Sequence, residues 1–259
     1  MLLEGKVAIV AGIGPGLGRA NALALARQGA DVALAARTQT RLDEVAGEVE
    51  ALGRRALPVQ ADITRAEDCE NVVATTLAKL GRADVLVNNA FQMPPFETLP
   101  DTKIDAIRDS FEINLFAPLM LSQCVIPHMA ERGSGSIVMI NSVVLRHAKP
   151  NYGAYKMAKH ALLGMARNLA CEVGPQGIRV NSVAPGYVGD ATVDLVAKLQ
   201  GMAEKRPEPE VKRELLETLM LRRAAEPEEI ADAVVFFASD MSRSITGQCL
   251  DVNGGEYTH

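Results

Sequence analysis

The sequence predicts an α/β protein in which about seven parallel strands form a doubly wound sheet with helices on both faces. Short runs of β-branched and apolar residues alternate with longer amphipathic segments, which is typical of parallel strands joined by crossover helices. Some of the short runs, such as residues 7–10 and 85–87, are continuously apolar. Strands that are covered by helices on both faces have this composition.

The same alternation locates the individual elements. The predicted strands are 6–11, 31–36, 56–60, 85–88, 136–141, 179–184 and 248–252. The predicted helical stretches lie near 17–28, 40–52, 66–80, 101–131, 152–173 and 227–239. Right-handed crossovers between such strands place a ligand crevice at the carboxyl ends of the strands.

Length and charge limit the class of protein. The chain has 259 residues, with 27 Lys and Arg against 32 Asp and Glu, for a net charge of −5. This mild acidity argues against a protein that binds the nucleic-acid backbone. No apolar run approaches the ~20 residues that cross a bilayer, so we expect no membrane association. We expect one domain over residues 1–259, with a flexible lid at about 186–212, where glycine and proline are frequent.

The four cysteines, at positions 69, 124, 171 and 249, lie far apart in the sequence. They form no CxxC motif and have no metal-ligand spacing, so we expect no metal site. Four buried, free thiols in a reducing compartment are therefore favoured over disulfides, and the predicted location is the cytoplasm.

A glycine-rich turn follows the first predicted strand. Gly12, Gly16 and Gly18 form a Gly-x-x-x-Gly-x-Gly pattern at the start of a helix, and Leu17 breaks the strict GxGxxG spacing. Glycines let the backbone approach a pyrophosphate, and a helix amino terminus offers free N–H groups and partial positive charge. The turn could serve packing alone, but a strand before it and a helix after it favour a dinucleotide site.

The end of the second strand distinguishes between two forms of such a cofactor. NAD sites usually carry Asp or Glu there to hold the ribose hydroxyls, whereas this chain has Ala36 and Arg37. A guanidinium can pair in bidentate geometry with a 2′-phosphate, although Arg37 could also simply begin a solvated helix. The sequence favours NADP(H) over NAD(H).

Four polar residues form a candidate catalytic set. Tyr155 and Lys159 lie one turn apart on the same face of a helix. Ser142 ends a strand that terminates at the crevice, and Asn114 lies in the helical stretch before that strand. With the glycine turn, Asp62-Ile63, residues 88–90, 185–186 and 251–255, this order resembles the short-chain dehydrogenase/reductase family over essentially the whole chain.

The resemblance implies a Rossmann-like enzyme that interconverts a carbonyl and a secondary alcohol by hydride transfer with NAD(P)(H). Tyr155 would be the acid/base, and since free tyrosine titrates near ~10, Lys159 would help by favouring the phenolate and would bind the nicotinamide ribose. Ser142 would donate a hydrogen bond to the substrate oxygen, and Asn114 would hold a water that links Lys159 to solvent.

The family pattern also implies the cofactor contacts. They are Gly12, Gly16, Leu17, Gly18, Arg37, Asp62, Ile63, Asn89, Ala90, Tyr155, Lys159, Pro185 and Val188. A second group of residues would surround the mouth of the crevice, namely Phe91, Met93, His147, Tyr152 and Tyr187. These side chains suit an apolar ketone or secondary alcohol, although ordinary packing explains each one singly. The family also implies a homotetramer that pairs through the helix at 152–173.

Three positions depart from the family pattern: Ala11 replaces a common threonine, Phe91 a common glycine, and Asp190 a common threonine. They put the fit of the cofactor and substrate in question. Two other functions stay open. One is a non-catalytic dinucleotide-binding sensor, which would usually have lost the tyrosine or the lysine. The other is an epimerase or dehydratase of the same fold with a tightly held nicotinamide.

Overall fold

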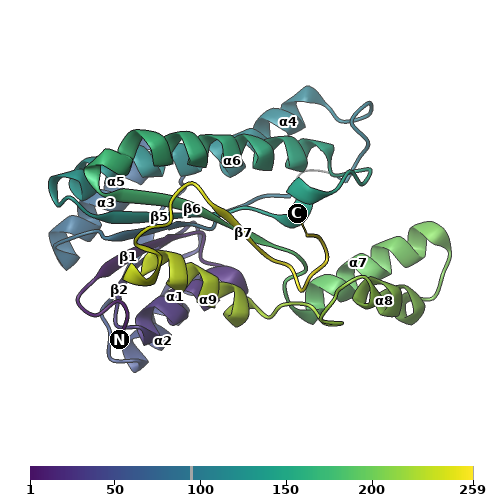
Figure 1. The fold of residues 1–259 in the computed structure, drawn as a ribbon, viewed down its shortest axis with the longest axis horizontal. Helices are drawn as coiled ribbons and strands as arrows, with labels where there is room; N and C mark the ends of the chain where they lie inside the picture. The colour runs from purple at the N-terminus through teal and green to yellow at the C-terminus, as the bar shows by residue number, and fades with distance from the viewer. Residues whose placement is uncertain (94–95, 259) are drawn as a thin grey trace.

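A single parallel sheet forms the centre of the molecule (Figure 1). The computed structural model describes residues 1–93 and 96–258. Its seven strands lie in the order β3-β2-β1-β4-β5-β6-β7, and every neighbouring pair is parallel. The strands are β1 (Val7–Ala11), β2 (Asp31–Ala36), β3 (Ala56–Gln60), β4 (Val85–Asn88), β5 (Gly135–Ile140), β6 (Ile178–Pro185) and β7 (Cys249–Val252). The predicted fold class is confirmed, and each predicted strand boundary lies within one residue of the observed one.

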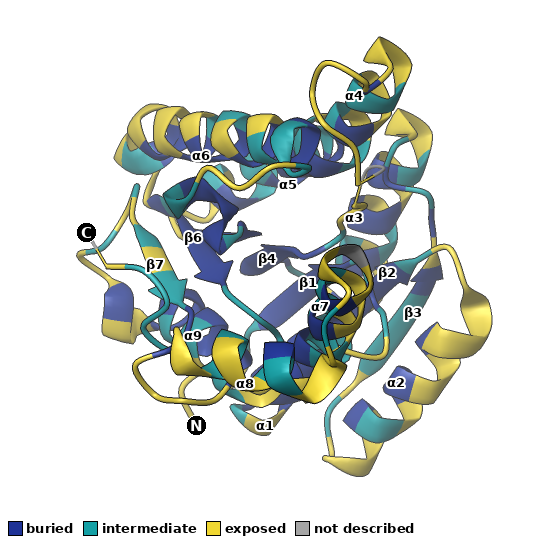
Figure 2. Cartoon of the chain, turned by 90° about the vertical axis from the view of Figure 1, so that its right-hand side faces the viewer, coloured by how far each residue is buried: buried dark blue, intermediate teal, exposed yellow. Residues whose placement is uncertain are grey.

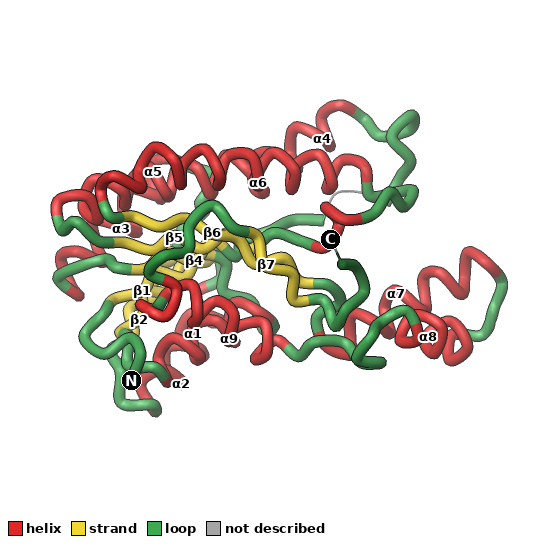
Figure 3. Tube along the Cα trace, viewed as in Figure 1, coloured by secondary structure: helices red, strands yellow, loops and turns green. Residues whose placement is uncertain are grey.

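Helices cover both faces of the sheet (Figure 3). One layer consists of α1 (Leu17–Arg27), α2 (Gln39–Ala51) and α9 (Pro227–Ala238). The other consists of α3 (Ala66–Leu80), α5 (Ala117–Glu131) and α6 (Gly153–Val173). Successive strand residues alternate between the two cores: Val10 and Val138 pack toward α1 and α9, while Ile9 and Met139 pack toward α5 and α6. Both faces therefore need apolar side chains, which explains the continuously apolar runs.

Local sequence determines where several helices begin and end. Pro227 is the first residue of α9, and Glu226 and Glu229 form a reciprocal capping box there. Gly81 ends α3 in the left-handed conformation, with φ of 84°. The loops therefore begin at fixed points, and those at the carboxyl ends of the strands are held in place.

The crevice lies between β1 and β4, where the strand order reverses. The Asn89 backbone N–H donates to the Ala11 carbonyl at 2.9 Å, and the Asn89 side-chain amide donates to the Gly12 carbonyl at 2.7 Å. Gly12 has φ of 96°, and a Cβ there would lie 2.4 Å from the Ala90 backbone. Only glycine fits at this position, so the loops after β1 and β4 lock together at the predicted crevice.

The predicted helix over 101–131 is a continuous helical run with an internal irregularity. It consists of α4 (Ile104–Phe111), a π-helical turn η1 (Glu112–Phe116) and α5. By length and composition alone, the helical run Ile104–Glu131 could cross a membrane. It is the one such helix among residues 1–93 and 96–258. This corrects the expectation that no apolar stretch of the sequence is long enough to do so. Here Leu121 and Met129 are fully buried against the sheet, as in a core helix.

The segment expected to be a flexible lid forms two helices, α7 (Gly189–Glu204) and α8 (Glu208–Glu217). They project beyond the carboxyl ends of the strands, and much of their surface is exposed (Figure 2). Lys212 pairs with Asp194 at 2.6 Å and links the two helices. The glycines and prolines that suggested a flexible lid partly mark helix ends, since Gly189 begins α7 and Pro207 caps α8.

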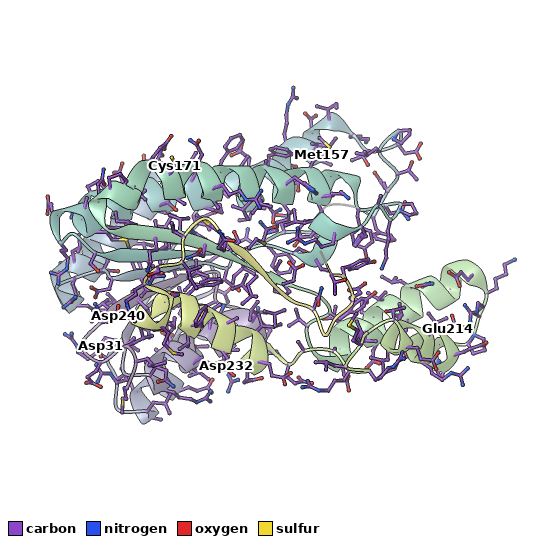
Figure 4. The ribbon with its side chains drawn as sticks, in the orientation of Figure 1. Asp31, Met157, Cys171, Glu214, Asp232 and Asp240 are labelled. Carbon is purple, nitrogen blue, oxygen red and sulfur yellow. The ribbon has the colours of Figure 1, made fainter. Side chains whose placement is uncertain are left out.

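All four cysteines are free thiols, as predicted. Only Cys69 is fully buried, whereas Cys171 is exposed on α6 (Figure 4). The expectation of four buried thiols is therefore wrong. Cysteine is often buried, but Cys171 lies on the outward face of α6.

Candidate active site

The glycine turn leaves an open space in front of α1. A Cβ added at Gly14 or Gly16 would meet no atom within 4 Å. Helix α1 has no side-chain cap and no acidic residue in its first turn, and the Leu17 and Gly18 N–H groups donate to no acceptor among the described residues. Free N–H groups at a helix amino terminus bind anions, so this turn fits the pyrophosphate of a dinucleotide.

Gly18 has a different role in the same turn. A Cβ at Gly18 would lie 2.2 Å from the Gly12 carbonyl oxygen and 3.0 Å from the Asn89 side-chain nitrogen. Gly12 and Gly18 therefore let the backbone pack closely, whereas Gly14 and Gly16 border the open space. Sequence reasoning included Gly16 among the cofactor residues but passed over Gly14.

Arg37 and Asp62 follow the carboxyl ends of β2 and β3. Arg37 is exposed and makes no ion pair with any residue of the described chain. Asp62 accepts hydrogen bonds from the Thr64 hydroxyl at 2.7 Å and backbone N–H at 3.1 Å. The Thr64 hydroxyl bond is the main cause that holds the pKa of Asp62 below its usual range, and the nearby Arg37 contributes. The next residue, Ile63, is buried.

The remaining predicted cofactor residues lie at or after the carboxyl ends of β4 and β6. Asn89 is fully engaged in holding the glycine turn, because its side-chain oxygen also accepts from Asn21 at 3.3 Å. Its neighbour Ala90 packs against Gly12. Pro185 ends β6, and Val188 follows it, with the Thr192 hydroxyl donating to the Val188 carbonyl at 2.7 Å. These residues thus lie at the carboxyl ends of strands of the same parallel sheet.

Helix α6 brings Tyr155 and Lys159 together, as the spacing predicts. Tyr155 is 7% exposed and Lys159 only 2%. The Lys159 Nζ lies 5.5 Å from the centre of the Tyr155 ring and donates to the Ile140 carbonyl at 2.9 Å. Since Ile140 is the last residue of β5, this bond joins the catalytic helix to the end of the strand that carries Ser142.

Ser142 lies between β5 and a short 3-10 helix, η2 (Val143–Arg146). Its hydroxyl accepts a hydrogen bond from the Val144 N–H at 3.2 Å and also hydrogen-bonds Tyr155. Burial raises the pKa of Tyr155 above its ordinary value, and the Ser142 hydrogen bond opposes that shift. Tyr155 is therefore protonated at neutral pH and suited to act as an acid.

Burial acts on Lys159 in the opposite direction and lowers its pKa to about 7. That the Lys159 charge favours the phenolate of Tyr155 stays a prediction. A pKa near neutrality lets a group gain and lose a proton easily. Lys159 is thus suited to carry protons.

Asn114 lies in the π-helical turn and is completely buried. Its side-chain nitrogen donates to the carbonyls of Ser110 and Gln92, each at 2.9 Å. Its side-chain oxygen has no hydrogen-bond partner among the described residues. Such unpaired buried acceptors are rare and costly, and π-helical turns occur often at functional sites. The oxygen fits the predicted part in a proton relay.

Aromatic side chains gather at the mouth of the crevice. His147 and Tyr152 pack edge to face with ring centres 5.5 Å apart, and Phe96 packs edge to face on Tyr152 at 5.1 Å. Tyr187 is half-buried, and burial raises its pKa to about 12. Sequence reasoning missed Tyr257, whose ring centre lies 5.6 Å from that of His147.

Phe91 and Met93, the other predicted pocket residues, are exposed on the loop after β4. Asp190, a departure from the family pattern, is exposed in the first turn of α7, where the helix dipole favours a negative charge. Ala11 is the buried last residue of β1. None of the three departures thus disturbs the packing around Tyr155 and Lys159.

Long-range contacts anchor the loop that follows Ser142. Arg146 binds Asp251 on β7 through two hydrogen bonds of 2.8 and 3.0 Å, with both side chains largely buried. The Lys156 ammonium donates to the His147 carbonyl. No sequence signal pointed to these partners, because the Arg146 and Asp251 positions are 105 residues apart.

Comparison with known proteins shows to which family the chain belongs. The family model described as enoyl-(acyl carrier protein) reductase, a short-chain dehydrogenase model, matches residues 12–257. Human dehydrogenase/reductase SDR family member 4 is 34% identical over 253 residues, which cover 98% of this chain and 88% of the human protein. The chain belongs to the short-chain dehydrogenase/reductase family.

Other family members match in both sequence and structure. The 7α-hydroxysteroid dehydrogenase of Escherichia coli K12 is 32% identical over 254 residues, covering 98% of this chain and 94% of that protein. A structure of 7α-hydroxysteroid dehydrogenase with NADH and 7-oxo glycochenodeoxycholic acid has a TM-score of 0.88, 32% identity, and coverage of 98% and 94%. Carveol dehydrogenase from Mycobacterium avium, in complex with NAD, has a TM-score of 0.92, 33% identity and 98% coverage of both chains.

These findings identify the chain as a short-chain dehydrogenase/reductase that acts on CH–OH groups with a nicotinamide dinucleotide as acceptor. The open space before α1 fits that cofactor. Gly14, Gly16 and the first N–H groups of α1 would hold its pyrophosphate, and Lys159 its nicotinamide ribose.

The buried Lys159 makes the stability of the protein depend on pH. Its pKa is about 7 in the folded chain and near ~10.5 when unfolded, so between these values the unfolded state binds more protons. The cost of burying the ammonium is therefore full below pH 7 and is relieved as pH rises. We expect Lys159→Met to be more stable than wild type at pH 7. This difference in the free energy of unfolding should shrink by at least about 1 kcal/mol by pH 10.

Urea unfolding at pH 7, 8.5 and 10 measures this difference. Lys103→Met, which removes an exposed ammonium group, is the control for the substitution. A difference between Lys159→Met and wild type that stays constant with pH would show that Lys159 titrates normally in the folded protein.

Proposed function

We propose that the enzyme is an NADP(H)-dependent reductase that interconverts an apolar ketone and the corresponding secondary alcohol. The observation that carries this proposal is the buried, protonated Tyr155 hydroxyl, hydrogen-bonded to Ser142 and next to Lys159. A neutral tyrosine can give a proton to a carbonyl oxygen, which favours the reductive direction. The nicotinamide, when bound, supplies the hydride.

Each catalytic side chain then has a role that its surroundings support. In reduction, Tyr155 donates its proton to the substrate oxygen as negative charge develops there. The Ser142 hydroxyl donates a hydrogen bond to the same oxygen and stabilises that charge. Lys159 returns a proton to Tyr155, and the Asn114 side-chain oxygen accepts a hydrogen bond in the relay that recharges Lys159. In oxidation the protons move in reverse.

Tyr155→Phe removes the proposed proton donor and keeps the ring. We expect turnover to fall about 100- to 10 000-fold, since a positioned acid contributes that much. Cofactor affinity, measured by isothermal titration calorimetry, should stay within a few-fold of wild type, because the lost hydroxyl contacts the substrate. Turnover retained by Tyr155→Phe would refute the assignment.

The preference for NADP(H) rests on charge at the end of β2. No carboxylate follows Ala36, and the exposed Arg37 has no ion-pair partner in the described part of the chain. The structural relatives named above carry NAD or NADH. The proposed preference for NADP(H) is therefore argued from the residues of this chain and not from its relatives. Arg37 can accept a 2′-phosphate as its partner.

We therefore expect NADPH to bind about tenfold or more tightly than NADH, because a charge-assisted bidentate pair contributes about 1.5–3 kcal/mol. Arg37→Ala should remove most of this preference by weakening NADPH binding alone. The control is Arg132→Ala, which removes an exposed arginine that follows α5 at the amino ends of the strands. Calorimetry measures both affinities, and equal binding of the two cofactors by wild type would contradict the proposal.

The assembly that we propose is a homotetramer that pairs through α6. Met157 on the outer side of α6 and Phe116 in η1 are each 43% exposed, so this layer offers apolar side chains to a partner (Figure 4). Light scattering at micromolar concentration should give the mass of four chains. A monomer mass would exclude this assembly.

A further inference from the structure

His147 is held in one hydrogen-bonding form. The Lys149 backbone N–H donates to the His147 Nδ1 at 3.2 Å, so Nδ1 carries no proton. Burial, together with the charges of Lys149 and Lys156, lowers the pKa of His147 to about 4. The imidazole is therefore neutral at physiological pH, and its single proton lies on Nε2.

The position of the ring is fixed from several sides. Tyr152 packs against it edge to face at 5.5 Å, and Tyr257 packs against it at 5.6 Å with a 39° tilt. The His147 carbonyl accepts a hydrogen bond from the Lys156 ammonium. A donor held in place in this way loses little conformational entropy when it forms a hydrogen bond.

The Nε2–H group has no acceptor among the described residues, whereas the Lys149 ammonium nearby has one. Nε2 makes no hydrogen bond with any residue that the structure describes, although His147 is half-buried. The Lys149 ammonium, by contrast, pairs with Glu256 at 3.2 Å and lies 5.7 Å from the centre of the Tyr257 ring. A fixed donor that the described residues leave open to solvent can bind a polar group of a ligand.

His147 also lies close to the chemistry along the chain. It follows Ser142 by five residues, and its packing partner Tyr152 precedes Tyr155 by three at the start of α6. Phe96, an exposed apolar side chain, packs on Tyr152 in the same cluster of aromatic rings. A substrate there meets apolar surface and one fixed donor besides those at the reacting oxygen.

We propose that His147 is a specificity-determining residue that donates its Nε2–H to a second oxygen of the substrate. The substrate class is then an apolar ketone or secondary alcohol about the size of a substituted cyclohexanone. It carries a second, hydrogen-bond-accepting oxygen away from its reacting carbon. This inference rests on the proposed function, and it adds a requirement that the catalytic residues alone do not impose.

Two ketones of similar shape test the requirement. Methyl 4-oxocyclohexanecarboxylate carries a second acceptor oxygen, and 4-isopropylcyclohexanone carries none. We expect wild type to prefer the ester about five- to tenfold in kcat/KM, as one neutral hydrogen bond gives. His147→Asn keeps an acceptor near the Lys149 N–H but lacks the distal donor, so its ratio should fall to about one.

Two further variants separate the donor from other effects of substitution. His147→Gln places an amide N–H near the Nε2 position and should recover part of the preference. His160→Asn, an exposed histidine on α6, should leave the ratio as in wild type. A wild-type ratio of one, or an unchanged ratio in His147→Asn, overturns the inference but leaves the proposed reduction of ketones intact.

Failure of wild type to reduce either ketone would count against the proposed function, and the donor is then tested without turnover. Long-range ¹H–¹⁵N NMR spectra of the four histidines show which nitrogen is protonated, and His147→Asn assigns the signals. We expect His147 at pH 7 with Nε2 protonated and Nδ1 bare. Protonation of Nδ1, alone or in an imidazolium, would overturn the inference.

Discussion

The side chain of Lys159 lies almost entirely out of contact with solvent, and the active site is organised around the cost of burying it there. An unpaired buried ammonium is expensive. The hydrogen bond from Nζ to the carbonyl of Ile140 offsets part of this cost. The cost that remains disfavours the charged form and lowers the pKa of the lysine to about 7. The same burial raises the pKa of Tyr155 above its ordinary value. One constraint therefore yields a protonated tyrosine beside a lysine that exchanges protons near neutrality.

The parallel sheet explains why these groups meet. All strands end at the same edge, so the glycine turn after β1, Arg37 after β2 and Ser142 after β5 converge although they are far apart in the sequence. The close contact between Gly12 and Ala90 fixes the loops at the strand-order reversal. The π-helical turn at Asn114 leaves one buried amide oxygen that has no partner in the described part of the chain. Fold and chemistry thus depend on the same short list of backbone contacts.

Much of this could be predicted from the sequence, because the signals are local. Apolar runs located every strand, and the spacing of Tyr155 and Lys159 placed both on one helical face. The misses have physical reasons. A π-helical turn keeps nearly helical periodicity, so Asn114 appeared to lie in a regular helix. Glycine and proline in residues 186–212 suggested a flexible lid, so helices α7 and α8 were not predicted. The burial of Tyr155 and Lys159 and the Arg146–Asp251 pair both depend on long-range packing.

Transfer of a labelled hydrogen from cofactor to product tests the central claim most directly. Wild-type enzyme would be incubated with NADPH deuterated at the transferring C4 position and 4-isopropylcyclohexanone, and the alcohol analysed by mass spectrometry. Our account predicts one deuterium at the carbinol carbon of the product. Alcohol without deuterium, or no alcohol while the cofactor stays bound and unchanged, would contradict a reductase and favour a binding protein or an enzyme that retains its nicotinamide.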